Sequence, residues 1–482
     1  MFKKKRYWVL IIYVALLAAS FAVRFWADPA VPSAEKKLIE ISDGSDAPVS
    51  VAYLETANSN GAKQTVVMVH GSPGSAEAFD GLTRQFPGRH IIAVDLPGFG
   101  DSDRDVPDYS ILAHAKYLNA FLSKKGISKA HFVGFSLGGG VIAQSANLNP
   151  QLIQSITFIS SVGVQEYELF GDYYLNHAVH GLQLGIAWLL QEFVPHFGYF
   201  DGGLIEYSRN FYDTDQRPLR EILQNYAGPM LILHGKDDPL VPVEAARETA
   251  RIVPQSEYHE LDDNHFFVFM RPGTISARMN QFWKRVENGE GVSREGASVS
   301  RVAAAAGPFE FKVIPAKGPA IFCFLLLILF VALANEDMAA VVAGVFIAQG
   351  RFGFVLPLIA FSLAVLVSGL FWRRIGRRRR GITLSASFPF SVDSRKADAF
   401  GFRFLSYIKR SRDSFFHFIG VSIGLGLLRA VLIGGAVYLI MMVAVFSGFI
   451  RNSNTLLLLA LGFSAIVVKA LGSLYFRSRR SR

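Results

Sequence analysis

The stretch Lys129-Ala-His-Phe-Val-Gly-Phe-Ser-Leu-Gly-Gly-Gly-Val-Ile-Ala143 decides the fold of this chain. The apolar run 131–133 predicts a buried strand, and the apolar pattern of 141–146 predicts a helix. Between them lies a G-x-S-x-G turn, in which the central residue has a strained backbone and projects its side chain above the sheet. Ser136 is therefore the candidate nucleophile. Gly134 and Gly138 are expected to let the strand and helix backbones approach closely.

The composition separates a middle region of ordinary soluble character from apolar flanks. The 482 residues are 51% hydrophobic and 18% charged, against about 25% charged in a typical soluble protein. The apolar excess lies in the first 30 residues and after about Pro319. The net charge of +10 comes from basic residues beside apolar segments, which is typical of topology signals and not of nucleic-acid binding. Cys323 is the only cysteine, so no intrachain disulfide can form.

The N-terminal segment predicts a membrane anchor. Met-Phe-Lys-Lys-Lys-Arg is followed by the almost wholly apolar run 7–26, which is long enough to span a bilayer. A cleaved signal peptide is the alternative, with Ala18-Ala-Ser20 as a cleavage site, but the apolar run continues beyond it. We predict an uncleaved anchor over 1–28 and a linker over 29–48. Because Lys-rich ends stay cytoplasmic, the next domain is expected on the periplasmic side of the inner membrane.

Residues 49–286 alternate strand and helix patterns. The β-branched run 64–70 and the run 90–95 lack polar alternation, as expected of parallel strands buried on both faces. The alternation predicts an α/β fold, a mostly parallel sheet with helices on both faces. Ligands of such sheets bind at the carboxyl ends of the strands. The polar residues at or just after predicted strand ends are His70, Asp95, Ser136, Asp238 and His265.

The segment 164–228 interrupts this alternation and is rich in Tyr, Phe, Leu and His. We predict a helical lid over the site that carries an apolar acyl-type pocket. Packing of a small helical layer is the alternative.

A serine hydroxyl becomes a good nucleophile when a base, most often imidazole, takes its proton. A carboxylate then fixes the tautomer of the imidazole. Two acidic runs follow late strands, His234-Gly-Lys-Asp-Asp-Pro239 and Asp262-Asp-Asn-His265. We predict His265 as the base and Asp238 as its carboxylate; the alternative carboxylates are Asp237, Asp262 and Asp263.

The oxyanion that forms during acyl transfer needs donors, usually backbone N–H groups. We predict the amide of Leu137, at the start of the helix after the turn, and the amide of Ser72, in the loop after the 64–70 strand. His70 and Gly71 bring that loop close, and His70 is expected to be structural. The histidines expected to pack or lie at the surface are His114, His131, His177, His180 and His196.

Over residues 49–286 the chain resembles the α/β-hydrolase fold family. That resemblance implies a serine hydrolase, esterase- or lipase-like, without cofactor or metal. The family pattern G-x-x-D, counted from Gly235, makes Asp238 the catalytic acid. A serine nucleophile differs from the aspartate of the dehalogenase and epoxide-hydrolase branches. The motifs that carry the resemblance are His70-Gly-Ser-Pro-Gly74, Asp95-Leu-Pro-Gly-Phe-Gly-Asp-Ser102, Gly134-Phe-Ser-Leu-Gly138, His234-Gly-Lys-Asp-Asp-Pro239 and Asn264-His265.

The remainder of the chain predicts a linker over 287–318 and an α-helical, multi-pass membrane domain over 319–482. The strongly basic stretch 373–412 is expected in the cytoplasm. The apolar stretch 338–372 must then enter and leave on one side, as a re-entrant arm that turns at 350–353. Further apolar spans are predicted at 319–334, within 415–449 and at 456–475.

The run that begins Asn335-Glu-Asp-Met338, with Gly376-Arg377 downstream, resembles the DedA-like (VTT, SNARE-associated) membrane domain. That family usually has a Gly-Asp pair before its Gly-Arg, where this chain has Ser368-Gly369. Glu336 and Asp337 are candidates for a proton or headgroup site, or for the polar cap of a hairpin.

Together these features predict an inner-membrane serine hydrolase with a periplasmic catalytic domain. Its expected partners are the lipid bilayer and a small apolar ester or lipid, with no nucleic acid. The alternative is a DedA-like transporter or lipid scramblase whose hydrolase-fold domain is only a binding module.

Overall fold

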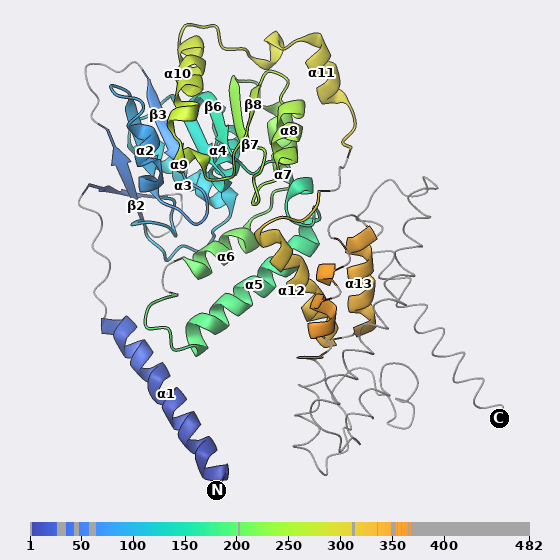
Figure 1. Cartoon of the computed structure of the whole chain (residues 1–482). Helices are drawn as coiled ribbons and strands as arrows, with labels where there is room; N and C mark the ends of the chain where they lie inside the picture. Colours follow the sequence, from blue (N-terminus) through green and yellow to red (C-terminus); the bar gives the residue numbers. More distant parts are fainter. Residues whose placement is uncertain are drawn as a thin grey trace, which may run out of the picture. The chain divides into compact units, whose positions relative to one another are not determined.

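The computed structural model describes residues 2–26, 35–42, 48–56, 64–200, 203–310, 314–334, 336–348 and short pieces between 353 and 367. The chain divides into two units, Met1–Glu310 and Phe311–Arg482 (Figure 1). The first unit holds the N-terminal helix α1 (Phe2–Trp26) and a sheet with its covering helices.

Within the described residues the first unit contains one eight-stranded sheet, in the order β1-β2-β4-β3-β5-β6-β7-β8. The pairs β1/β2 and β2/β4 are antiparallel and all the others are parallel. The α/β class with a mostly parallel sheet is thereby confirmed. The strands are β1 (Lys37–Ile41), β2 (Val49–Glu55), β3 (Thr65–Val69), β4 (His90–Val94), β5 (Ala130–Phe135), β6 (Ile153–Ile159), β7 (Met230–Gly235) and β8 (Glu257–Leu261).

The central strands are buried on both faces. On one face, Val66 and Met68 of β3 pack in a cluster with Phe79 and Trp283. Val67, between them, points to the opposite face and is fully buried there. The helical elements around the sheet are η1 (Ala76–Phe79), α2 (Asp80–Thr83), α3 (Ile111–Lys124), α4 (Leu137–Leu148), η2 (Pro150–Leu152), α8 (Val243–Ile252), α9 (Phe267–Met270) and α10 (Gly273–Glu287).

The segment 164–228, predicted as a helical insertion, begins with η3 (Gln165–Tyr167) and continues as three helices, α5 (Tyr173–Phe193), α6 (Leu204–Asp213) and α7 (Pro218–Asn225). Helices α5 and α6 pack side by side (Figure 1). The ring of His177 stacks on Tyr212, with 4.2 Å between ring centroids. The backbone N–H of Tyr109 donates to Asp213 Oδ2 at 3.0 Å, which fastens α6 to the segment before α3.

Two segments predicted as linkers carry regular structure. Within the predicted linker 29–48, Lys37–Ile41 is strand β1, because Ile39 and Ile41 turn inward while Lys37 and Glu40 stay exposed. Within the predicted linker 287–318 lie η4 (Arg294–Gly296) and α11 (Val299–Ala306). Alanine is the best helix former, so an Ala-rich composition does not exclude a helix there.

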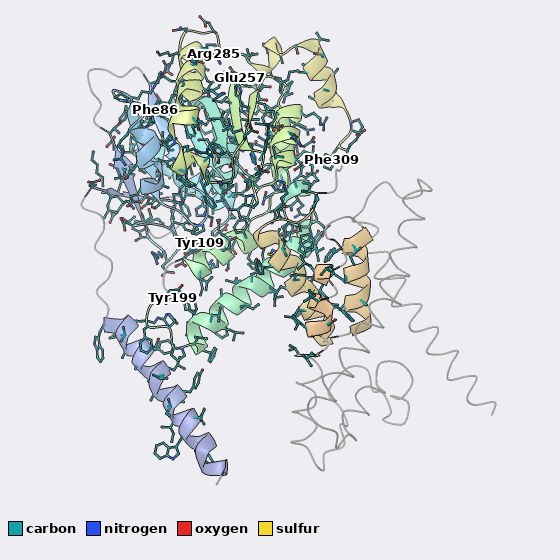
Figure 2. All side chains as sticks on the ribbon, viewed as in Figure 1. Phe86, Tyr109, Tyr199, Glu257, Arg285 and Phe309 are labelled. Atoms are coloured by element: carbon teal, nitrogen blue, oxygen red, sulfur yellow. The ribbon has the colours of Figure 1, made fainter. Side chains whose placement is uncertain are left out.

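Helix α11 is fastened to the sheet domain by two arginines. Arg301 Nη1 donates to the carbonyl of Ser256 at 2.5 Å, and Arg251 Nη1 donates to the carbonyl of Ala304 at 2.6 Å. The compact unit therefore continues beyond the predicted domain end at residue 286. Arg285 of α10 also forms a surface ion pair with Glu257 of β8, and both residues are labelled in Figure 2.

The second unit contains α12 (Pro319–Ala334) and α13 (Glu336–Ala348), and Phe324 and Phe346 pack edge to face between them at 4.8 Å. Among the described residues, one helix is long and apolar enough to cross a membrane, Tyr7–Trp26. The basic stretch 373–412, the spans predicted after it and the Ser368-Gly369 and Gly376-Arg377 pairs lie outside the described residues.

A buried ionic cluster joins the segment before β1 to loops at the carboxyl ends of the parallel strands. Lys36 Nζ lies 2.6 Å from Asp95 Oδ2, 2.7 Å from Glu77 Oε1 and 3.1 Å from Asp101 Oδ2. Burial alone lowers the pKa of Lys36, but hydrogen bonds to Asp95 and Glu77 raise it above its ordinary value, so the amine stays charged. Asp95 Oδ1 also accepts the N–H of Ala76 at 2.6 Å. The cluster therefore fixes the loop after β3.

Replacing Lys36 by Met is expected to destabilise the sheet domain, because it leaves the Asp95 carboxylate buried without its cation. We expect the thermal unfolding midpoint to fall by roughly 5 °C or more. The control is Lys37→Met. The Lys37 side chain is 58% exposed, and exposed pairs contribute about 0–1 kcal/mol. Differential scanning fluorimetry of the detergent-solubilised chain measures both midpoints; equal shifts would contradict a structural role for Lys36.

Candidate active site

Ser136 occupies a strained turn between β5 and α4. Its φ of 52° and ψ of −121° are unusual for a residue with a Cβ. A Cβ on Gly138 would lie 2.2 Å from the carbonyl oxygen of Val69, and one on Gly134 would lie 2.6 Å from the Cα of Gly139. Neither position can hold a larger residue without moving backbone. The two glycines therefore permit the close packing of β3, β5 and α4 that this turn needs.

The carbonyl of Ser136 is held by three donors. The N–H groups of Gly139 and Val162 donate to it at 3.2 and 3.1 Å, and Ser161 Oγ donates to it at 3.1 Å. Ser161 follows β6, and the sequence offered no motif that would single it out. These contacts fix the turn, which leaves the Ser136 side chain only partly buried among wholly buried neighbours.

Asp238 and His265 form a buried hydrogen-bonded pair. His265 Nδ1 lies 2.6 Å from Asp238 Oδ2, and Asp238 Oδ1 accepts the N–H groups of Leu240 and Val241, both at 2.8 Å. Burial alone raises the pKa of Asp238, but the hydrogen bond from His265 lowers it below its usual value. The carboxylate is therefore ionised and orients the imidazole with Nε2 free of this contact.

His234 also lies beside the Asp238 carboxylate. Burial lowers its pKa, so the ring is neutral, and its Nε2 lies 2.9 Å from the carbonyl of Val241. The ring nitrogen is also 3.4 Å from Asp238 Oδ2. His234 thus helps to position the turn that carries Asp238.

The three alternative carboxylates lie elsewhere. Asp237 is exposed. Asp262 forms an exposed ion pair with Lys236 at 2.7 Å, and Asp263 pairs with Arg271. Of the four acidic residues weighed from the sequence, the structure brings Asp238 to His265.

The ring of His265 reaches the base of the serine turn. Its centroid lies 4.8 Å from that of Phe135, the residue before Ser136. Within the described residues, no hydrogen bond joins the Ser136 hydroxyl to the ring.

The loop after β3 passes directly over Ser136. A Cβ on Gly71 would lie 2.8 Å from the Cβ of Ser136, so the backbone beside Ser72 approaches the candidate nucleophile closely. Ser72 Oγ is buried and has no hydrogen-bond partner. Leu137, the other residue predicted to supply an oxyanion donor, is the first residue of α4.

His70 is engaged by backbone at both ring nitrogens. Nε2 accepts the N–H of Leu96 at 3.0 Å, and Nδ1 lies 2.6 Å from the carbonyl of Gly71. Burial lowers its pKa, so the ring is neutral. With both nitrogens occupied, His70 holds the loop and is not placed to transfer a proton.

The remaining histidines named from the sequence have packing or hydrogen-bonding roles in the body and the insertion. Among the described residues, no group of three or more His, Cys, Asp or Glu side chains is arranged to hold a metal ion. The contacts are His114 with Tyr109, His131 with Ser155, His177 with Tyr212, His180 with Glu168 and His196 with Gln191.

The sheet domain is similar in sequence to known hydrolases. Residues 64–187 match a family model described as the alpha/beta hydrolase fold. Lipase 1 of Psychrobacter immobilis is 33% identical over 245 residues, which cover 44% of this chain and 74% of the lipase. An esterase structure from Thermogutta terrifontis aligns over 52% of this chain and 99% of its own, with 16% identity and a TM-score of 0.44.

A different kind of relative shares a shorter stretch. The dihydrolipoyllysine-residue acetyltransferase component of the acetoin cleaving system of Cupriavidus necator is 34% identical over 120 residues. The match covers 24% of this chain and 30% of that protein. The lipase match, by contrast, spans most of the lipase, and together with the family model it shows that the chain belongs to the α/β-hydrolase fold family.

Proposed function

We propose that the protein is a membrane-anchored serine hydrolase that cleaves an ester-like substrate through an acyl-enzyme intermediate. The observation that carries the proposal is the arrangement at the strand ends. Ser136 sits on a turn with positive φ, and His265 is held by a buried carboxylate on the neighbouring loop. A nucleophile, a base and a carboxylate that orients the base form the constellation that acyl transfer needs.

In the proposed reaction, His265 Nε2 takes the proton of the Ser136 hydroxyl while Oγ attacks the substrate carbonyl. Asp238 accepts the Nδ1–H of His265 and stabilises the imidazolium that forms. His265 then gives the proton to the leaving alcohol, which departs from the tetrahedral intermediate. In the second half His265 takes a proton from a water molecule, which attacks the acyl carbonyl, and His265 returns that proton to Ser136 Oγ as the carboxylic acid leaves.

The oxyanion is assigned to the amides of Leu137 and Ser72. The Leu137 N–H lies at the N-terminus of α4, where the first N–H groups of a helix lack intrahelical partners and favour negative charge. The Ser72 loop lies against Ser136 and is fixed by Asp95 through Ala76. The buried, unpartnered hydroxyl of Ser72 is a further donor for the same oxygen.

An apolar acyl ester or lipid is the proposed substrate class. Helices α5 and α6 carry aromatic side chains that pack against one another within the insertion. A relative that is 33% identical to this chain over 245 residues carries the name Lipase 1. The predicted lid of residues 164–228 would then form the wall that contacts the acyl chain.

A fluorophosphonate probe is expected to label Ser136 covalently in the full-length protein. Ser136→Ala should abolish labelling and lower hydrolysis of a p-nitrophenyl ester by at least about a thousandfold, because the nucleophile is lost. Ser276→Ala, a surface serine of α10, is the matched control and should label normally. Absence of labelling in folded wild-type protein would contradict the enzyme and leave a domain that only binds.

Substitution of the acidic residues distinguishes the orienting carboxylate from its sequence neighbour. Asp238→Asn should lower kcat/KM for the same ester by roughly 10³–10⁴-fold, because the imidazole loses its tautomer partner and its charge stabilisation. Asp237→Asn should stay within about threefold of wild type, since that side chain is exposed. Steady-state kinetics with active-site titration measure both; a larger loss for Asp237→Asn would refute the assignment.

The proposed location is the inner membrane, with α1 as an anchor and the hydrolase domain in the periplasm. The support is the apolar span Tyr7–Trp26 behind a Lys-rich start. The multi-pass, DedA-like membrane domain over 319–482 remains part of the proposal.

Protease added to intact spheroplasts should digest the hydrolase domain if it faces the periplasm. Immunoblotting with an antibody to residues 49–286 should show loss of the band, while a cytoplasmic marker survives. Protection of the domain alongside digestion of a periplasmic marker would place it in the cytoplasm.

A further inference from the structure

Helix α1 contacts the insertion through a stripe of polar residues within its apolar span Tyr7–Trp26. Tyr13, Ser20 and Arg24 are separated by seven and four positions, so they share one face of the helix. Tyr13 OH donates to the carbonyl of Phe193 at 2.6 Å, and Arg24 Nη1 donates to the carbonyl of Gln191 at 3.1 Å. The partners of this stripe lie at the end of α5.

Ser20 completes the contact by accepting two backbone N–H groups. His196 N and Phe197 N lie 3.1 and 2.9 Å from Ser20 Oγ, and Ser20 is almost wholly buried. His196 pins the same turn, with Nε2 3.0 Å from the carbonyl of Gln191 and Nδ1 accepting the N–H of Phe200 at 3.2 Å.

These bonds satisfy the backbone groups that a helix end leaves free. The last carbonyls of α5 and the N–H groups of the following turn have no intrahelical partners. In water, solvent would form hydrogen bonds to them, but in hydrocarbon an unpaired backbone group is strongly unfavourable. Side chains of α1 and His196 supply these partners, as a segment at membrane depth requires.

The residues of α1 that make this contact lie inside its apolar run. From Tyr13 to Arg24 the helix rises by about 16 Å, and both residues fall within the span Tyr7–Trp26. The turn that is hydrogen-bonded to this part of α1 therefore lies in the same environment, lipid or water, as the helix itself.

The tip of the insertion, residues 188–199, presents an apolar surface around these bonds. Trp188 and Phe193 pack edge to face at 5.6 Å. Figure 2 shows Tyr199 in the loop that joins α5 and α6, where it is 85% exposed. No side chain in 188–199 is basic apart from His196, and Glu192 is the only acid. The exposed large hydrophobic residues of the tip are Trp188, Leu189, Phe193, Val194, Phe197 and Tyr199.

We propose that the tip 188–199 is a bilayer-binding surface that inserts into the lipid around α1. The occupant is lipid, and not a soluble partner, because α1 carries the tip along its own apolar span and supplies the hydrogen bonds that water would otherwise make. The inference rests on the anchoring role proposed above for α1, but not on the hydrolytic chemistry. It implies that substrate reaches the predicted lid from the membrane.

The test places a polarity-sensitive label at single cysteines in the full-length chain, with Cys323→Ser as the background. The sites are Phe197→Cys in the tip, Val9→Cys in α1 and Val299→Cys on α11, where Val299 is 86% exposed. Each variant is labelled with a bimane and reconstituted into phosphatidylethanolamine/phosphatidylglycerol vesicles. Quenching by lipids brominated on the acyl chain is compared with quenching by aqueous iodide.

Labels at 9 and 197 should be quenched by brominated chains and shielded from iodide, and the label at 299 should show the reverse. If 9 is quenched but 197 behaves like 299, the anchor stands and the tip does not insert. If neither is quenched, the anchor is wrong as well. If 197 is shielded from both quenchers, the tip is covered by protein, which also overturns the proposal.

Two further variants distinguish membrane contact of the tip from the proposed hydrolysis at Ser136. Adding Ser136→Ala should leave quenching at 197 unchanged, because the nucleophile takes no part in membrane contact. Ser20→Val removes the acceptor for His196 and Phe197, and should increase iodide access at 197 at least twofold while fluorophosphonate labelling of Ser136 persists. An unchanged iodide response in Ser20→Val would show that the contact with α1 does not hold the tip.

Discussion

The positive φ of Ser136 is the constraint on which the site depends. A residue with a Cβ held in such a conformation is destabilised by about 1–3 kcal/mol, so the neighbourhood must over-determine it. Three donors hold its carbonyl, and a glycine at 138 lets α4 press against the end of β3. The same close approach brings the Gly71 backbone onto Ser136. The loop after β3 and the turn at Ser136 therefore depend on the same close packing of backbone.

Features encoded in short stretches could be predicted from the sequence. The β-branched runs gave the parallel strands because a strand buried on both faces has no polar alternation. The G-x-S-x-G motif predicted the strained turn at Ser136, because the serine and both glycines that the turn needs lie within five consecutive residues. Asp238 was harder, since four carboxylates were available. What distinguishes it is the turn after β7, whose amides at 240 and 241 bind its other oxygen, and this geometry is not visible in residue types alone.

Features that depend on distant partners could not be predicted. Lys36 looked like one more charged residue in a linker, because its partner Asp95 is 59 positions away. Strand β1 has only five residues, too few for its alternation to stand out from polar surroundings. Helix α11 is held by Arg251 and Arg301, and an arginine on a helix surface gives no sign of which carbonyl it binds.

The polar stripe of α1 lies between these two cases. Polar groups inside an apolar span are costly unless they find partners, so Tyr13, Ser20 and Arg24 on one helix face indicate that something binds there. The sequence cannot say what, because the partners are backbone groups some 170 residues later. The need to pair backbone groups explains why these partners are bound. The end of a helix and the turn after it can leave water only when side chains replace the hydrogen bonds of the solvent. The proposed anchor α1 and the proposed lid are thus joined by side-chain hydrogen bonds that replace the solvent of the turn after α5. An ester-cleaving site below such a lid would receive substrate from the bilayer.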